Sequence, residues 1–275
     1  MPIYIQTNVS AMSAQKNLQM NQSALTESFN RLSSGYRINS AKDDAAGLAI
    51  SESMKSQIRS FTVAERNAQD AVSMSQTAEG ALGEIHGILG RMRELAVQGS
   101  NGSLTSTDRG FLEAEFDALQ EEMTRIQGSA RFNGRNVVAA TSESITFQVG
   151  LNDTSVDQIT LTFGGVALTS VITSASVSGT TTSLALTALS TIDSAITTVS
   201  TARARFGSAM NRMSVATSTI QTMRLNLSAA NSRIRDVDVA DETASLSRNQ
   251  VLTQAGISVL GQANQLPQLA FGLLG

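Results

Sequence analysis

The 275-residue sequence contains no cysteine, no tryptophan and only one histidine, His86. Without cysteine the chain can form neither disulfides nor thiolate metal sites. A single histidine cannot make an HExxH metal site, and it lacks a second group that would orient and activate it for catalysis. The acidic pairs Asp43–Asp44 and Glu121–Glu122 are more typical of a helix cap and a solvated helix face than of catalytic dyads. We therefore expect no catalytic residue, no metal site and no cofactor.

Aromatic residues make up only 4% of the sequence, which leaves little material for a thick globular core. The net charge of -3 is too small to indicate a nucleic-acid partner. No stretch approaches the roughly 20 apolar residues that a membrane-spanning helix needs. The first residues, "MPIYIQTNVSAMSAQ", have neither a basic region nor a continuous apolar segment. We expect no membrane insertion and no cleaved signal peptide.

What the sequence does contain is apolar residues three and four positions apart, the spacing of helices that pack along narrow seams. In residues 9–32, three leucines repeat every seven positions. Residues 45–98 carry an unbroken stripe, and a single helix of that length would be roughly 80 Å long at 1.5 Å per residue. The sequence therefore predicts a rod. Its predicted seam includes Ile85, Ile88, Met92 and Leu95, with Met213 and Ile220 from residues 189–227, where the same spacing returns.

Both ends of the chain are poor in charge, and their apolar stripes are thin. Helices this short are marginal in water when alone, so the two ends should be loose until something covers them. The repeating apolar residues are Leu18, Leu25 and Leu32 in the first segment, and Leu252, Val259 and Leu266 in the last.

The stretch "LSSGYRINSAKDDAAGLAISE", residues 32–52, interrupts the helical pattern with serine, glycine, asparagine and aspartate, which end helices. It separates the first segment from the rod. We predict a joint here, with special backbone roles for Gly35 and Gly47.

The middle of the chain changes period. After a turn at residues 99–107, Thr107 and Asp108 are expected to open a shorter helix. "SITFQVG" and "QITLTFGG" then alternate apolar and polar residues, which predicts two antiparallel strands. We interpret residues 164–183, rich in serine and threonine, as a third short strand or an exposed loop.

Several long motifs closely resemble bacterial flagellin, the filament subunit of the flagellum. They include "NVSAMSAQKNL", "RLSSGYRINSAKDDAAGLAISESMKSQIR", "AERNAQDAVSMSQTAEGAL", "RMRELAVQGSNG" and "NQVLTQAGISVLGQANQLPQLAFGLL". The resemblance covers roughly residues 1–150 and 183–275, in the same order as in the family. Only about forty residues occupy the interval where larger flagellins carry extra outer domains, so the chain looks like a short form.

The resemblance implies a mainly α fold: a long antiparallel helical bundle or coiled coil built from the N- and C-terminal segments, with a small β-hairpin subdomain in the middle. Three parts are expected. Residues 1–44 with 232–275 would form the terminal coiled coil of the filament's inner tube, with contacts through Leu18, Leu25, Leu32, Leu252, Val259 and Leu266. Residues 45–141 with 184–231 would form the helical rod of an outer tube, and residues 142–183 the β-hairpin and an exposed Ser/Thr-rich loop.

The implied function is a structural, non-enzymatic subunit that assembles head-to-tail into the extracellular filament for swimming motility. Its implied partners are other copies, the hook–filament junction and filament cap proteins, and an export chaperone on the C-terminal helix. The subunit would be exported without signal cleavage.

A host partner is also implied. In flagellins recognised by the flagellin-sensing Toll-like receptor, an arginine, a leucine and a glutamate on the neighbouring helix form the main contact. The matching positions here are Arg91, Leu95 and Glu122, on a surface that is also an axial contact between subunits.

Two other readings stay open from the residues alone. A hook–filament junction protein shares terminal helices of this kind, although it should not extend into long filaments unaided. A secreted coiled-coil binding module would instead be a stable monomer with ordered ends. An enzyme ranks last, because no constellation of residues supports one.

Overall fold

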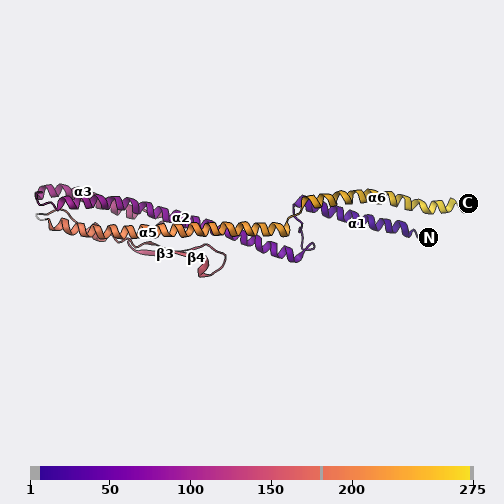
Figure 1. Cartoon of the computed structure of the whole chain (residues 1–275), viewed down its shortest axis with the longest axis horizontal. Helices are drawn as coiled ribbons and strands as arrows, with labels where there is room; N and C mark the ends of the chain where they lie inside the picture. The colour runs from indigo at the N-terminus through magenta and orange to yellow at the C-terminus, as the bar shows by residue number, and fades with distance from the viewer. Residues whose placement is uncertain (1–6, 180–181, 273–275) are drawn as a thin grey trace. The chain divides into compact units, whose positions relative to one another are not determined.

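The computed structural model of the chain describes residues 7–179 and 182–272, with the backbone alone over 266–272. The fold is mainly helical with a β-hairpin in the middle of the chain (Figure 1), as predicted, and it also contains a second, smaller hairpin. It divides into two units, Met1–Ser56 with Asn226–Gly275 and Gln57–Leu225. The helices are α1 Val9–Ser34, α2 Ala45–Gly99, α3 Ser106–Ser129, α4 Thr169–Ser174, α5 Ser183–Arg235 and α6 Val239–Gly272. The three-part division remains a prediction.

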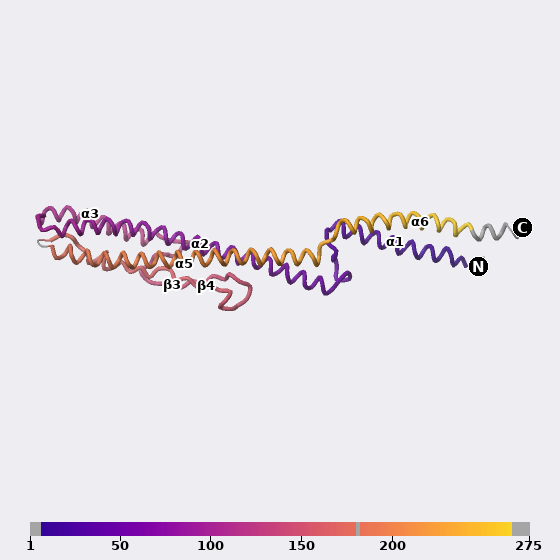
Figure 2. The backbone as a smooth tube through the Cα atoms, viewed as in Figure 1, coloured from indigo at the N-terminus to yellow at the C-terminus, as the bar shows by residue number. Residues whose placement is uncertain are grey.

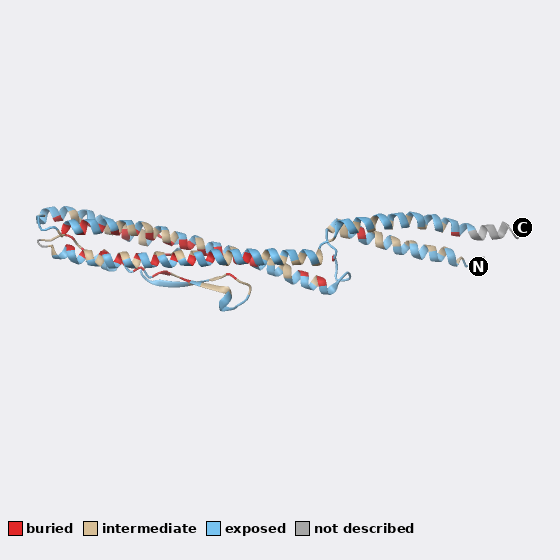
Figure 3. Cartoon of the chain, viewed as in Figure 1, coloured by how far each residue is buried: buried red, intermediate tan, exposed pale blue. Residues whose placement is uncertain are grey.

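In the unit Gln57–Leu225, α2 and α5 run antiparallel, as the ion pairs between them show. Glu65 pairs with Arg224, Glu79 with Arg203, and Asp193 with Arg93. Between these pairs, the buried side chains form a stripe along both helices (Figure 3). Many of them are alanines, which allow close approach of the helices. The buried set includes Ala64, Ala68, Ala71 and Ala78 of α2 and Ala188, Ala195, Ala202 and Ala209 of α5.

Helix α3 follows α2 after a connecting turn at residues 100–105. Its start lies slightly before the predicted one, because Thr105 and Asp108 form a capping box. The Thr105 amide donates to Asp108 Oδ2 at 2.9 Å, and the Asp108 amide donates to Thr105 Oγ1 at 3.3 Å. Hydrogen bonds from the Thr105 hydroxyl and amide lower the pKa of Asp108. Phe116 and Met123 bury the apolar face of α3.

The two predicted strands are β3, Ser142–Gln148, and β4, Gln158–Gly164, joined through the short 3-10 turn Ser155–Asp157. Their register pairs Ile145 with Leu161. One face packs on α5, where the ring of Phe163 lies 5.3 Å from that of Phe206. The other face is a row of hydroxyls, with Thr146 and Thr160 3.0 Å apart. A smaller hairpin pairs β1 Arg131–Phe132 with β2 Arg135–Asn136.

The prediction of a third strand or an exposed loop over residues 164–183 was wrong. This segment contains α4, and it buries Val166, Leu168, Val171 and Val177. The reason is that α3 supplies hydrogen-bond partners for its backbone. Gln120 Nε2 donates to the carbonyl oxygens of Val171 at 2.7 Å and of Ala175 at 2.9 Å, and the Glu113 carboxylate accepts from two further amides.

Candidate assembly surfaces

The joint begins where α1 ends at Gly35. Gly35 has φ 74°, in the left-handed region, and its amide donates to the Arg31 carbonyl at 2.9 Å. A residue in this conformation commonly ends a helix, and glycine adopts it without steric cost. The special backbone role predicted for Gly35 therefore has a geometric counterpart.

Two chain segments cross the joint side by side. The Arg37 amide donates to the Arg235 carbonyl at 2.7 Å, and the Val237 amide donates to the Gly35 carbonyl at 3.1 Å. The Arg235 guanidinium also lies over the Tyr36 ring, 4.6 Å from its centroid. Backbone hydrogen bonds and a cation–π contact thus hold the joint, which is an ordered connection.

At the other end of the joint, Gly47 is closely surrounded. A Cβ atom there would lie 2.3 Å from Asp44 Oδ2 and 2.8 Å from Ile38 Cδ1, so only glycine fits without a shift. Asp44 caps the first turn of α2 by accepting the Gly47 amide at 2.9 Å. The neighbouring Asp43 carboxylate accepts hydrogen bonds from Ser40 and Asn39, which lower its pKa.

Helices α1 and α6 pack along each other in the unit Met1–Ser56 with Asn226–Gly275 (Figure 2). The leucines predicted for this seam, Leu18, Leu25 and Leu32, are half-buried. The facing surface of α6 is small or polar over much of its length. Among its described side chains, the buried or half-buried positions are Glu242, Ser245, Leu246, Asn249, Thr253, Gly256, Leu260 and Ala263.

The apolar residues of α6 that were predicted to pair with α1 lie on the exposed side of the helix. Leu252 is 44% exposed, Val259 53% and their neighbour Val251 68%. The structure therefore brings Leu252 and Val259 to the outside of the pair, away from the α1 leucines. The side chain of Leu266 lies outside the described residues. On α1, the outward apolar residues are Val9, Met12, Met20 and Phe29.

The residues predicted for the rod seam lie in the interior of the unit Gln57–Leu225. Ile85, Met92, Met213 and Ile220 are buried, and Ile88 is half-buried. The seam consists of aliphatic and thioether side chains, so its role in the unit is packing.

Arg91 lies on the exposed surface shared by α2 and α3. Its guanidinium pairs with Glu115 of α3 at 2.7 Å and with Glu94 at 2.8 Å, and the hydrogen bonds that it donates to these two carboxylates raise its pKa. Leu95, by contrast, is 1% exposed. Glu122 pairs with Arg125, whose hydrogen bonds lower the pKa of Glu122.

The structure thus brings Arg91 together with Glu115 and not with Glu122. Sequence reasoning missed Glu115, although a signal was available. Arg91 and Glu115 are equally far along the chain from Ser103, in the middle of the turn between α2 and α3. Residues equidistant from a tight turn face each other across an antiparallel helix pair.

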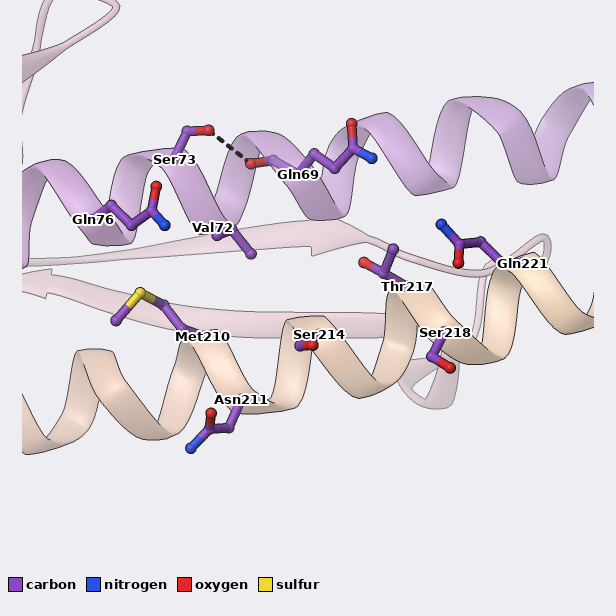
Figure 4. Close-up of a pocket in the computed structure, with 10 residues that line it drawn as sticks. All are labelled: Gln69, Val72, Ser73, Gln76, Met210, Asn211, Ser214, Thr217, Ser218 and Gln221. Carbon is purple, nitrogen blue, oxygen red and sulfur yellow. Dashed lines mark hydrogen bonds between the residues drawn. The ribbon is translucent and has the colours of Figure 1, made fainter.

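A groove between α2 and α5 is lined by uncharged side chains (Figure 4). Its amides and hydroxyls carry no titratable group, so it offers contacts and no acid–base chemistry. Over the described residues, no group of three or more metal-ligating side chains is found. The lining residues are Gln69, Val72, Ser73 and Gln76 of α2 and Met210, Asn211, Ser214, Thr217, Ser218 and Gln221 of α5.

Two family models match the chain. The bacterial flagellin N-terminal helical region matches residues 5–143, and the bacterial flagellin C-terminal helical region matches residues 189–274. The chain belongs to the bacterial flagellin family. The resemblance noted in the sequence is thereby confirmed, and the matched regions contain the joint, the terminal helices and Arg91.

Similar flagellins differ in how much of their length this one covers. It is 42% identical to the flagellin of Halalkalibacterium halodurans, over 98% of this chain and 99% of the relative. It is 46% identical to the B-type flagellin of Pseudomonas aeruginosa over 55% of this chain, but only 31% of that longer relative. Full-length similarity to the first of these agrees with a short form of the family.

Two solved structures resemble this flagellin. The crystal structure of Bacillus cereus flagellin has a TM-score of 0.49 and 34% identity, covering 60% of this chain and 94% of the other. A structure described as a flagellar hook-associated protein from Vibrio parahaemolyticus has a TM-score of 0.60 and 13% identity, covering 70% and 100%. The latter likeness concerns the fold alone.

Family membership establishes that the chain is a polymer subunit. Flagellins are structural proteins that assemble into the bacterial flagellar filament, and this chain is such a subunit. In the part of the chain that the structure describes, no helix is both long and apolar enough to cross a membrane.

Proposed function

We propose that this flagellin builds its filament by burying, between neighbouring copies, the apolar side chains that its own α1–α6 pair leaves outside. The observation that carries the proposal is the exposed stripe of Val251, Leu252 and Val259 on α6. The outward residues of α1, including Met12 and Met20, add a second apolar surface on the same pair. Leu252 and Val259 would then contribute to the terminal coiled-coil assembly through neighbours, while Leu18, Leu25 and Leu32 contribute within the chain.

The energetics favour this arrangement. Burying several hundred Å² of apolar surface on each terminal helix contributes several kcal/mol, at about 25 cal/mol per Å². This gain in free energy must exceed the conformational-entropy cost of ordering the ends. Because ordering and burial occur together, assembly is cooperative. Contacts between different surfaces of neighbouring copies grow an open helical filament when the rotation does not close.

The test removes the stripe and keeps the seam. In the variant Val251→Ser/Leu252→Ser/Val259→Ser, we expect monomers of normal helix content by circular dichroism and no long filaments by electron microscopy. The matched control Gln250→Ser/Gln254→Ser/Gln262→Ser changes three exposed polar residues of the same helix and should assemble normally. Filaments of ordinary length from the first variant would contradict the proposal.

We also propose that the subunit acts outside the cell with the usual partners of its family. These are the hook–filament junction and filament cap proteins, and an export chaperone on the C-terminal helix. Family membership supports this set, and it supports a purely structural role without catalysis. Secretion without signal cleavage predicts that the filament subunit retains its encoded N-terminal sequence, which Edman sequencing or intact mass would check.

A receptor contact is the second function that a specific observation favours. Arg91 and Glu115 form an exposed pair on adjacent helices, so we propose them as the surface that the flagellin-sensing Toll-like receptor would contact. Leu95 is buried, so it would help to position Arg91 without contacting the receptor itself. Glu122 pairs with Arg125 and is not part of this Arg91–Glu115 surface.

A reporter-cell assay with the purified monomer tests this contact. Arg91→Ala and Glu115→Ala should each reduce receptor activation strongly. Arg93→Ala, which removes the exposed pair with Asp193, serves as the matched control and should have little effect. Equal activation by all three variants would argue against the contact.

A further inference from the structure

The pairing of α1 with α6 raises a question that helix spacing alone leaves open. Leu18, Leu25 and Leu32 are seven residues apart, and a helix pair with such a repeat can slip by one heptad and still bury its leucines. Much of the facing surface of α6 is small or polar, so bulk apolar burial distinguishes poorly between registers. Something else has to select one register.

Leu18 of α1 lies against Gly256 of α6 in this seam. A Cβ atom at Gly256 would lie 3.3 Å from Leu18 Cδ1 and 4.0 Å from Leu18 Cβ. The leucine thus occupies a notch that any larger residue would narrow. Gly261, five residues further along α6, has no atom within 4 Å of its Cβ position, so its missing side chain serves no such contact.

The notch by itself would also accept Leu25 after a one-heptad slip. Two polar contacts on either side of it remove that ambiguity. Asn8 Nδ2 donates to the Ala263 carbonyl oxygen at 2.8 Å, and Arg31 lies 3.7 Å from the Glu242 carboxylate. All three contacts fit an antiparallel pair, because the partner on α6 moves back along the chain as the residue on α1 moves forward. The steps are 10 residues against 7 from Asn8 to Leu18, and 13 against 14 from Leu18 to Arg31. A slip would break both polar contacts.

We propose that Leu18 in the notch at Gly256, together with the Asn8–Ala263 hydrogen bond, sets the register in which the two ends of one chain pair. These are positioning residues. They decide which turn of α6 lies opposite each turn of α1, and hence at which level along the pair Val251, Leu252 and Val259 are presented to neighbouring copies. The inference rests on the proposed function, because it concerns the pair within the assembled subunit.

The absence of native cysteine makes disulfide trapping a clean test. The distance of 4.0 Å between Leu18 Cβ and the Cβ position at Gly256 lies within the range of about 3.5–4.5 Å that a disulfide requires. Three double-cysteine variants would be polymerised with their cysteines reduced, and the finished filaments would then be oxidised. Leu18→Cys/Gly256→Cys reports the proposed register, Leu25→Cys/Gly256→Cys reports the one-heptad slip, and Leu18→Cys/Gly261→Cys reports an off-seam position.

We expect the first variant to form about tenfold more intrachain disulfide than either control, since only its Cβ atoms meet the distance requirement. Non-reducing electrophoresis and peptide mapping would distinguish intrachain from interchain products. Equal trapping of the slipped pair, or an interchain ladder in place of an intrachain product, would overturn the proposal. Adding Asn8→Ala to the first and second variants should raise the slipped product at the expense of the native one, and no change would remove Asn8 from the mechanism.

The proposed function fails in a different way. If the unmodified chain formed no filaments, or if the Val251, Leu252 and Val259 variant assembled normally, the outward stripe would be wrong while the register could still be measured. If filaments form and the Leu18→Cys/Gly256→Cys pair stays reduced under oxidation, the register is wrong while assembly stands.

Discussion

Arg109 of α3 donates a hydrogen bond of 2.9 Å to the carbonyl oxygen of Gly99, the last residue of α2. The same guanidinium reaches the carbonyl oxygens of Asn101 at 3.1 Å and Gly179 at 3.2 Å, and the residue is 3% exposed. A cation at the C-terminal end of a helix is also favoured by the helix dipole. One buried side chain therefore ties the end of α2, the following turn and the segment before α5.

The first prediction follows from those three bonds. Arg109→Met keeps the apolar stem but leaves buried carbonyl groups without a donor, which should lower the free energy of unfolding by about 2–4 kcal/mol. Urea unfolding of the monomer, followed by circular dichroism, measures the loss. Arg125→Met removes a guanidinium from the exposed pair with Glu122, and its urea midpoint should barely move. Equal midpoints for the two variants would refute the role of Arg109.

The second prediction concerns Gly35. Gly35→Val forces a β-branched residue to φ 74°, which should cost about 1–2 kcal/mol at this site, whereas Gly35→Asn should cost less. The joint should open more often in the valine variant, so the amides of Arg37 and Val237 should exchange faster with solvent. We also expect altered or impaired filaments by electron microscopy. Unchanged exchange rates in the valine variant would show that the left-handed cap is dispensable.

The third prediction compares two glycines of α2. Gly80 has open space around its Cβ position, so Gly80→Ala should stabilise the helix by about 0.5–1 kcal/mol. At Gly47, the clashes with Asp44 and Ile38 should reverse the sign, although the added methyl group is the same. Urea midpoints of the two variants, measured side by side, should move in opposite directions. Stabilisation by both would mean that the joint repacks freely.

The fourth prediction concerns pH. Hydrogen bonds from Ser40 and Asn39 hold the pKa of Asp43 below its ordinary value of 3.8. A carboxyl group with a lowered folded-state pKa contributes stability above its unfolded pKa, and this stability is lost as the pH falls through the folded value. The joint should therefore loosen as the pH falls below about 4.

Hydrogen exchange at the Ser40 amide, measured against acid-corrected reference rates, would follow this loosening. Asp43→Asn keeps an acceptor oxygen but cannot titrate, so its protection should vary less between pH 5 and pH 3 than that of the unchanged chain. The same pH dependence in both proteins would assign the effect to other groups.

The sequence was informative wherever a side chain's burial depends on its own helix or strand. The stripe through Ile85, Met92 and Leu95 is buried as its spacing predicts, and the alternation around Phe163 places that ring in the core. The ends of elements were also readable, since glycine at position 35 and aspartate at position 44 stop and start helices through local hydrogen bonds. Local spacing and local chemistry account for these features.

Residues 164–183 show where that reading stops. Their serines and threonines favour an exposed segment, yet Gln120 and Glu113 of α3 satisfy its backbone and allow Val171 and Val177 to be buried. Gln120 and its acceptor at Val171 are more than fifty residues apart in the sequence, so no local pattern predicts the contact. Long-range hydrogen bonds decided this part of the fold.

By itself, the sequence determined that the chain is helical at both ends, carries a joint near Gly35 and belongs with flagellins. Only the tertiary structure decided which faces meet: Gly256 opposite Leu18, Leu252 turned outward, and Glu115 beside Arg91. The physical reason is that periodicity marks a face of a helix without naming its partner. A glycine adds nothing to a hydrophobic pattern, but the space left by its missing side chain lets Leu18 lie against the backbone of α6.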